Sequence, residues 1–158
     1  MATVRATIVD DSTHGRVEAR VHALSSRGQF VAPPDAILKV GGGPPFFYAG
    51  GSFTLDLPLG DAQFILERGT EYRALTRTLT IPRSGAVDVE FRLQRWIDLR
   101  IDGWHAGNTH IHYDEHETRP DARLRLDPRV EDLSVAAISV LRRRELAYAS
   151  NKFRVGRR

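Results

Sequence analysis

The stretch Val87-Asp-Val-Glu-Phe-Arg-Leu93 alternates apolar and polar residues without a break. Successive side chains of a β-strand point to opposite faces, so this pattern predicts a strand whose apolar residues share one buried face. The same parity returns over residues 97–101, after an interruption at Gln94-Arg95-Trp96 where we expect a bend or bulge.

Working outward from this stretch, similar alternation occurs over residues 17–23 and 53–59. Clusters of Gly, Asp and Ser separate the alternating runs and predict turns. Residues 41–51, GGGPPFFYAGG, are too rich in Gly and Pro for a regular element and indicate a loop. The spacing therefore predicts a mainly β chain, with an antiparallel β-sandwich (Ig-like or carboxypeptidase-regulatory-like) over residues 1–95.

The pattern changes after residue 113, where a polar segment without any period predicts a loop. Asp127-Pro128 is typical of a helix N-cap followed by proline at the first helical position, so a short helix is expected over 129–133. The apolar run 135–141 is either a buried strand or a continuation of that helix. Residues 96–158 are thus expected to form a second unit, the strand-helix-strand start of an incomplete α/β domain.

Composition excludes several classes of function. The chain of 158 residues has no Cys, which excludes disulfides, thiolate nucleophiles and Cys-ligated zinc. No apolar run has the length of a signal peptide core or a membrane span, so we expect a cytoplasmic protein without a membrane partner. Residues 119–158 carry 11 basic and 5 acidic residues. The basic run Arg142-Arg143-Arg144 directly follows an apolar run, and no pattern of interleaved aromatic residues indicates base stacking, so nucleic acid is not an expected partner.

Four of the six histidines lie in Gly103–Glu117, GWHAGNTHIHYDEHE. His110 and His112 stand at i and i+2, a spacing that places both on one face of a strand, where two imidazoles can bind one metal ion. Asp114, His116 and Glu117 follow closely as further ligands or as acceptors that orient the imidazoles. The alternative is a solvent-facing polar strand end. His14 and His22 are expected at the surface, and His105 in a structural role beside Trp104.

The segment from Gly103 to Asn151 resembles the opening of the CehA/McbA family of metallohydrolases, which belongs to the PHP (polymerase and histidinol phosphatase) superfamily. That family begins its catalytic domain with a Gly-Trp-x-x-Gly-Asp-x-His-x-His signature and a later Glu-Asp-Leu element. The matching residues here are Gly103, Trp104, Gly107, His110 and His112, then Glu131-Asp132-Leu133. Upstream, 53–58, 67–72 and the Arg95-Trp96 junction resemble the β-sandwich that precedes the hydrolase domain.

The resemblance implies that His110 and His112 are the first ligands of a multinuclear site for divalent Zn, Mn or Fe, the metal itself being left open. Asn108 stands where the family usually has Asp, which removes a charge and leaves a neutral group beside the metal. The implied substrates are small phosphate esters or related esters and amides. Because the later ligands of the family are missing, we expect this chain alone to have no turnover.

The alternative function is a non-enzymatic β-sandwich accessory module that binds a partner or a carbohydrate. A continuation of the reading frame with His- and Asp-containing strand ends would favour the hydrolase, and a natural stop would favour the module. A homo-oligomer stays open under either interpretation.

Overall fold

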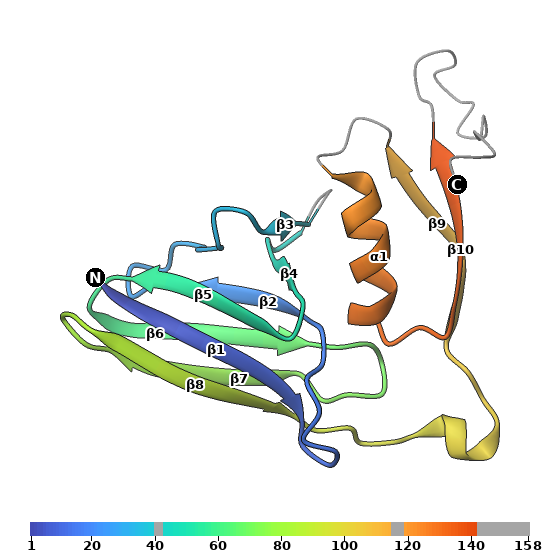
Figure 1. Cartoon of the computed structure of the whole chain (residues 1–158), viewed down its shortest axis with the longest axis horizontal. Coiled ribbons are helices and arrows are strands. Elements are labelled where there is room, and N and C mark those ends of the chain that lie inside the picture. Colours follow the sequence, from blue (N-terminus) through green and yellow to red (C-terminus); the bar gives the residue numbers. More distant parts are fainter. Residues whose placement is uncertain (40–42, 115–118, 142–158) are drawn as a thin grey trace.

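The computed structural model describes residues 1–39, 43–114 and 119–141, and the chain is mainly β, as predicted (Figure 1). In chain order the elements are β1 (Ala2–Asp10), β2 (Ala19–Leu24), β3 (Ile37–Leu38), β4 (Phe47–Ala49), β5 (Ser52–Leu57), β6 (Gly60–Glu67), β7 (Leu75–Ile81), β8 (Ala86–Leu93), the 3₁₀ helix η1 (Leu99–Asp102), β9 (Gly107–Asp114), α1 (Pro120–Val130) and β10 (Val135–Leu141).

The first eight strands form two sheets, with strand orders β5-β1-β8 and β3-β4-β2-β6-β7. Their pairs are antiparallel, as expected, except that β1 and β8 run parallel. The parallel register pairs Asp10 with Leu93, the last residues of these two strands. Strands β1 and β8, the first and last of the sandwich, therefore end side by side. The chain leaves the sandwich at this point.

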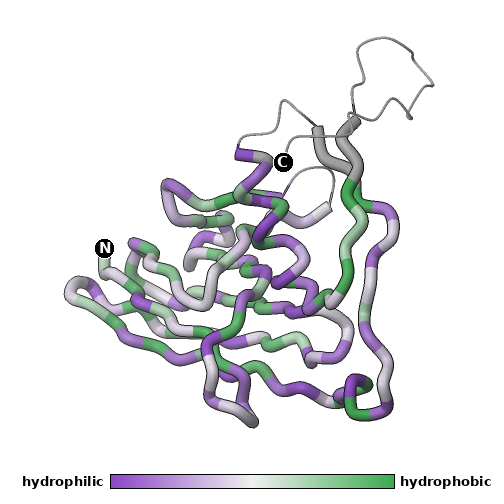
Figure 2. Tube along the Cα trace, turned by 45° about the vertical axis from the view of Figure 1, so that its right-hand side comes forward, coloured by the Kyte–Doolittle hydropathy of each residue, from purple (hydrophilic) through white to green (hydrophobic). Residues whose placement is uncertain are grey.

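The core lies between the two sheets and is rich in phenylalanine. Phe53 and Phe91 come from one sheet, and Phe47 and Phe64 from the other; their rings lie 5.2–6.3 Å apart in the pairs that touch. Strands β2, β5 and β6 contribute their alternate apolar residues to this layer, and Figure 2 shows hydrophobic and hydrophilic positions alternating along the sandwich strands. The alternation over 87–93 is thus confirmed as strand β8, with Phe91 fully buried.

Three expectations about strands and loops were wrong. The renewed parity over 97–101 does not continue a strand, because η1 occupies Leu99–Asp102 and none of its residues is buried. Strand β5 ends at Leu57, and Leu59 is 56% exposed. The Gly- and Pro-rich segment 41–51 contains β4, because Phe47 enters the core and pairs that strand with β2.

The second unit is a strand, a helix and a strand, in which β9 and β10 pair in parallel. The apolar run 135–141 is therefore a strand and not a helix. The helix, however, begins at Pro120, with Arg119 in the left-handed region before it, and Pro128 lies inside the helix. The Asp127-Pro128 pair was misread as a start signal, since the preceding turns are held by contacts with the sandwich that the sequence does not reveal.

Helix α1 lies against strands β2 and β4 of the sandwich (Figure 1). Val130 at its end is fully buried, and Arg123 is 7% exposed although it is charged. Tyr48 on β4 forms a hydrogen bond with Asp127 of the helix. These contacts fix α1, and with it the corner that leads into β10, on the sandwich. The division of the chain at residues 95 and 96 stays a prediction.

Candidate functional site

The candidate ligand His110 lies on β9, which we call the histidine strand. The pairing of β9 with β10 shifts register there: Asn108 pairs with Ala136, but Ile111 pairs with Ile138. The histidine strand thus advances three residues while β10 advances two, so one extra residue is accommodated at Thr109-His110. Such bulges re-aim side chains and occur often beside functional sites. The His110 side chain is exposed.

Asn108 compensates for this irregularity. Its side-chain oxygen accepts a hydrogen bond from the backbone N–H of His110 at 2.9 Å. A side-chain oxygen that bonds the amide two residues later forms a local turn of the kind that Asn and Asp favour. Asn108 was predicted as an additional ligand or as a group beside the metal; the structure shows it supporting the backbone of His110.

The other predicted site residues are only partly described. Backbone pairing places His112 opposite Ser139 and Asp114 opposite Leu141, while the side chains of both, and His116 and Glu117 entirely, lie outside the described residues. Among residues 1–39, 43–114 and 119–141, no group of three or more His, Cys, Asp or Glu side chains is placed to hold a metal ion. The site around His110 therefore stays a prediction.

The remaining described histidines lie outside β9. His105 is exposed in the segment before β9. His14 lies in a turn of the sandwich beside Arg92, and His22 faces the carbonyl of Pro45 and stacks on Phe30. The surface placement of His14 is confirmed, and His22 is half-buried.

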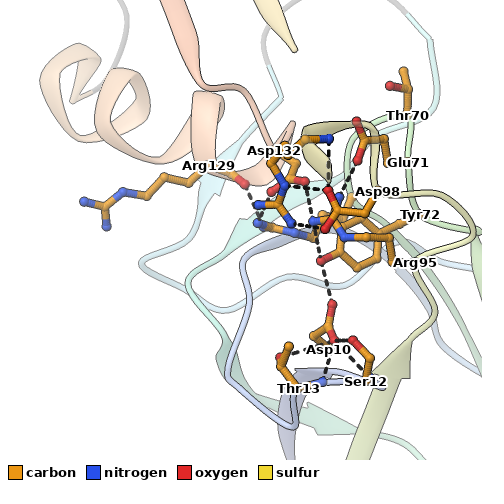
Figure 3. A network of polar contacts seen from close by, with 12 residues as sticks. Asp10, Ser12, Thr13, Thr70, Glu71, Tyr72, Arg95, Asp98, Arg129 and Asp132 are labelled. Atoms are coloured by element: carbon orange, nitrogen blue, oxygen red, sulfur yellow. Dashed lines mark hydrogen bonds and ion pairs between the residues drawn. The ribbon is translucent and has the colours of Figure 1, made fainter. Parts of the chain in front are cut away.

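A polar cluster joins the second unit to the sandwich (Figure 3). We call it the Asp132 cluster; it consists of Asp10, Arg68, Glu71, Tyr72, Arg95 and Asp132. At its centre Asp132 accepts a hydrogen bond on each carboxylate oxygen, from Arg68 Nη2 at 2.6 Å and from Arg95 Nη2 at 2.6 Å. The three side chains are only 9–16% exposed. Asp132 has a φ of 53°, a left-handed conformation that the two bonds help to hold.

Tyr72 carries the cluster into the sandwich. Its hydroxyl donates to Asp10 Oδ2 at 2.7 Å and accepts from Arg95 Nη2 at 2.8 Å. The Arg95 guanidinium also stacks over the Tyr72 ring, 4.2 Å from the ring centre. Asp10 in turn accepts bonds from the backbone and hydroxyl groups of Ser12 and Thr13. A chain of hydrogen bonds thus runs from the end of β1 to the α1–β10 corner.

Burial and hydrogen bonding shift the pKa values of three members of the cluster, Asp10, Arg95 and Tyr72. Burial alone would raise the pKa of the Asp10 carboxyl, but the hydrogen bonds from Ser12, Tyr72 and Thr13 outweigh burial and hold that pKa well below its usual range. Burial would likewise lower the pKa of Arg95, and the Asp132 carboxylate reverses this and raises it. The pKa of Tyr72 is raised by burial and by the bond to Asp10, so the hydroxyl keeps its proton.

Residues 129–132, between α1 and β10, make further close contacts with the sandwich. Gly69 has a φ of 45°, and a Cβ there would lie 2.5 Å from the Glu131 carbonyl oxygen. Arg68 Nη1 also donates to the Arg129 carbonyl at 2.6 Å, and Arg20 Nε lies 3.1 Å from Glu131 Oε1. Burial raises the pKa of Glu131 more than Arg20 lowers it. The 129–132 corner is therefore packed directly on the sandwich backbone.

Sequence reasoning missed this cluster. Its members come from four separate parts of the chain, namely Asp10, the segment 68–72, Arg95 and Asp132, and no sequence pattern links these parts. Two weak signals existed: Arg95 interrupts the alternation that begins at Val87, and Asp132 lies in the Glu-Asp-Leu element of the family resemblance. Neither signal indicates that the two residues touch.

Comparison with known proteins gives only distant likenesses. No known family matches the chain, and no curated protein matches it. The Bacillus anthracis TIE protein is similar in structure at 15% identity and a TM-score of 0.42, over 60% of this chain and 17% of that chain. BcpA, the major pilin subunit of Bacillus cereus, is similar at 13% identity and a TM-score of 0.38, over 58% of this chain and 29% of that chain.

This chain thus spans less than a third of the length of either protein, and likenesses this distant carry no functional conclusion. In the described part of the chain, no helix has the length and apolar character needed to cross a membrane.

Proposed function

We propose that this chain is the front part of a metal-dependent hydrolase of phosphate esters or related esters and amides, with His110 and His112 as its first metal ligands. The observation that carries the proposal is the irregular histidine strand at the head of a parallel strand-helix-strand unit. Binding sites in α/β folds lie at the carboxyl ends of parallel strands, and His112 and Asp114 are among the last three residues of β9. The resemblance to the CehA/McbA family supports the same assignment.

The donor set fits a divalent metal. Imidazole nitrogens bind Zn, Mn and Fe, and two of them at alternate strand positions supply half of a four-coordinate shell. Asn108 holds the His110 amide through its side-chain oxygen, which restricts the backbone that carries the ligand. When bound, the metal would polarise the scissile bond and lower the pKa of a bound water. The residues of this chain would bind the metal ion and fix its position.

Metal binding tests the assignment directly. We expect weak zinc or manganese binding by the purified chain in titration calorimetry, weakened about tenfold or more in His110→Ala and in His112→Ala because each change removes a ligand. His105→Ala is the matched control, since it changes an exposed histidine just outside β9, and should bind as the unaltered chain does. Equal binding by the double variant lacking His110 and His112 would overturn the proposal.

Asn108 gives a finer test. Asn108→Asp keeps an oxygen that can accept from the His110 amide and adds a negative charge, so its metal affinity should rise. Asn108→Ala removes the acceptor and should lower the affinity, although no ligand is lost. Turnover of an aryl phosphate is not expected from this chain alone. Turnover that a chelator abolishes would show that the chain needs no further ligands, while failure of both metal binding and turnover would favour the accessory module.

A further inference from the structure

Arg95 and Asp132 stand at the two ends of one segment. Arg95 lies two positions beyond the end of β8, where the chain leaves the sandwich, and Asp132 lies between α1 and β10. The segment between them contains η1, the histidine strand and α1. The hydrogen bond of 2.6 Å between Arg95 Nη2 and Asp132 Oδ2 therefore closes a loop around the whole of the histidine strand.

The closure is strong for physical reasons. Asp132 uses one oxygen for Arg95 and the other for Arg68, and all three groups are largely withdrawn from water. Arg95 is itself held by Glu71 Oε2 at 2.5 Å and by the Tyr72 hydroxyl, so its guanidinium has little freedom to move. Removing one partner from such a set leaves buried charge without compensation, which is strongly unfavourable.

The Arg95–Asp132 pair is connected to the histidine strand by backbone hydrogen bonds. Two residues after Asp132, the Ser134 amide donates to the Ala106 carbonyl at 2.8 Å, and Val135 then pairs with Gly107 at the start of β9. Ala136 pairs with Asn108, the residue that supports the His110 amide. A displacement of Asp132 therefore reaches the backbone of His110 through a short series of rigid contacts.

We infer that Asp132 and Arg95 are positioning residues, which form a clasp that fixes the histidine strand on the β-sandwich. The sandwich is then the platform that orients the candidate metal ligands. The positional claim stands on the contacts alone, and its consequence for metal binding rests on the proposed function. Asp98, which bonds Arg100 at 2.8 Å in an exposed pair, lies in the same segment without closing it.

Hydrogen exchange followed by mass spectrometry tests the clasp without any metal. In Asp132→Asn, the charge is lost while the shape is kept, and we expect amides of residues 106–111 and 135–138 to exchange at least tenfold faster. Amides of β1, β6 and β8 should exchange as before. Arg95→Lys keeps the charge but loses the planar fork, so its effect should be intermediate. Asp88→Asn is the control, because it changes an exposed carboxylate that lies 3.8 Å from Arg5, and it should change neither region.

Two outcomes would overturn the inference. Unchanged exchange over 106–111 in Asp132→Asn would show that the histidine strand does not depend on the clasp. Faster exchange throughout the sandwich would show that the cluster stabilises the sandwich itself. Zinc titration of Asp132→Asn then separates the two proposals: local loosening with weaker zinc binding supports both. If Asp132→Asn loosens the histidine strand but His110→Ala does not change the zinc affinity, the clasp is supported and the proposed function is not.

Discussion

The β-sandwich and the β9–α1–β10 unit bury different kinds of groups. The sandwich encloses a core rich in phenylalanine, and the buried hydrophobic residues of this core all lie between Ala2 and Leu93. Among the described residues of the second unit, Val130 is the one fully buried apolar residue, and polar contacts join this unit to the sandwich: the Asp132 cluster, the Arg20–Glu131 ion pair and the Tyr48–Asp127 hydrogen bond. Six of the nine large hydrophobic residues exposed in the described part of the chain lie beyond residue 95.

This difference teaches how the two parts depend on each other. Apolar burial is non-directional and stabilises a unit as a whole, whereas buried ion pairs act only in one geometry. Parallel strands are normally covered on both faces, and a pair of strands alone is marginally stable. The second unit therefore takes its orientation from the sandwich, while the sandwich has what it needs to fold in its own core.

The largest expected effect comes from breaking that core. Phe91→Ala removes a fully buried ring that touches Phe53 and Phe64, and should lower the free energy of unfolding by about 3–5 kcal/mol. Urea denaturation followed by circular dichroism measures this. Val135→Ala in β10 is the matched control, since its side chain is 60% exposed, and should change stability by less than about 0.5 kcal/mol. Equal losses from the two changes would contradict the comparison.

An intermediate effect is expected at the interface. Gly69→Ala places a Cβ 2.5 Å from the Glu131 carbonyl oxygen, in a backbone region that L-residues avoid, and should destabilise the docked state by about 2–3 kcal/mol. Gly28→Ala is the control. Gly28 has a φ of 72°, but a Cβ there would have no atom within 4 Å, so this change should destabilise the chain by about 1 kcal/mol through the backbone conformation alone.

Hydrogen exchange over 135–138 and urea denaturation together measure the difference between the two glycines. If Gly69→Ala exchanges and unfolds like Gly28→Ala, the 129–132 corner does not pack on Gly69 as the contacts indicate.

The sequence was sufficient for the parts held by apolar burial. Alternation predicted β2, β5 and β8 because each has one face in the core, and that information is local. Strand β4 was missed because Phe47 sits among glycines and prolines, and its strand geometry comes from pairing with β2. The start of α1 was missed because Arg119 offers no side-chain cap.

The candidate site also has one part that the sequence predicts and one part that it does not. The spacing predicts that His110 and His112 act as a pair, which stays a prediction, whereas the role of Asn108 depends on a register shift that only the pairing with β10 reveals. The Asp132 cluster was not predictable, since Asp10, Arg95 and Asp132 meet only after the sheets and the corner have formed.

The smallest expected effect concerns pH and the docking of α1. Burial, then Asp127, raise the pKa of Tyr48 from 10.0 to about 12. The unfolded chain therefore ionises first, so the stabilisation by neutral Tyr48 is complete below pH 10 and is lost as the pH rises toward 12. Because Tyr48 is half-buried and solvent screens part of the interaction, we expect a loss of about 1 kcal/mol.

Urea midpoints measured across this pH range test the assignment. Tyr48→Phe cannot ionise and should remove the portion of the curve that Tyr48 contributes. Tyr72→Phe removes the separate contribution of Tyr72, whose pKa is also raised, and should leave the Tyr48 portion in place. Tyrosinate absorbance in both variants identifies which hydroxyl titrates. Deprotonated Tyr48 would face the Asp127 carboxylate across the α1 interface, so its ionisation should speed amide exchange in α1 before it affects β1 or β8. Simultaneous loss of protection in α1 and β8 would mean that the two regions unfold as one, and the contrast between them would fail.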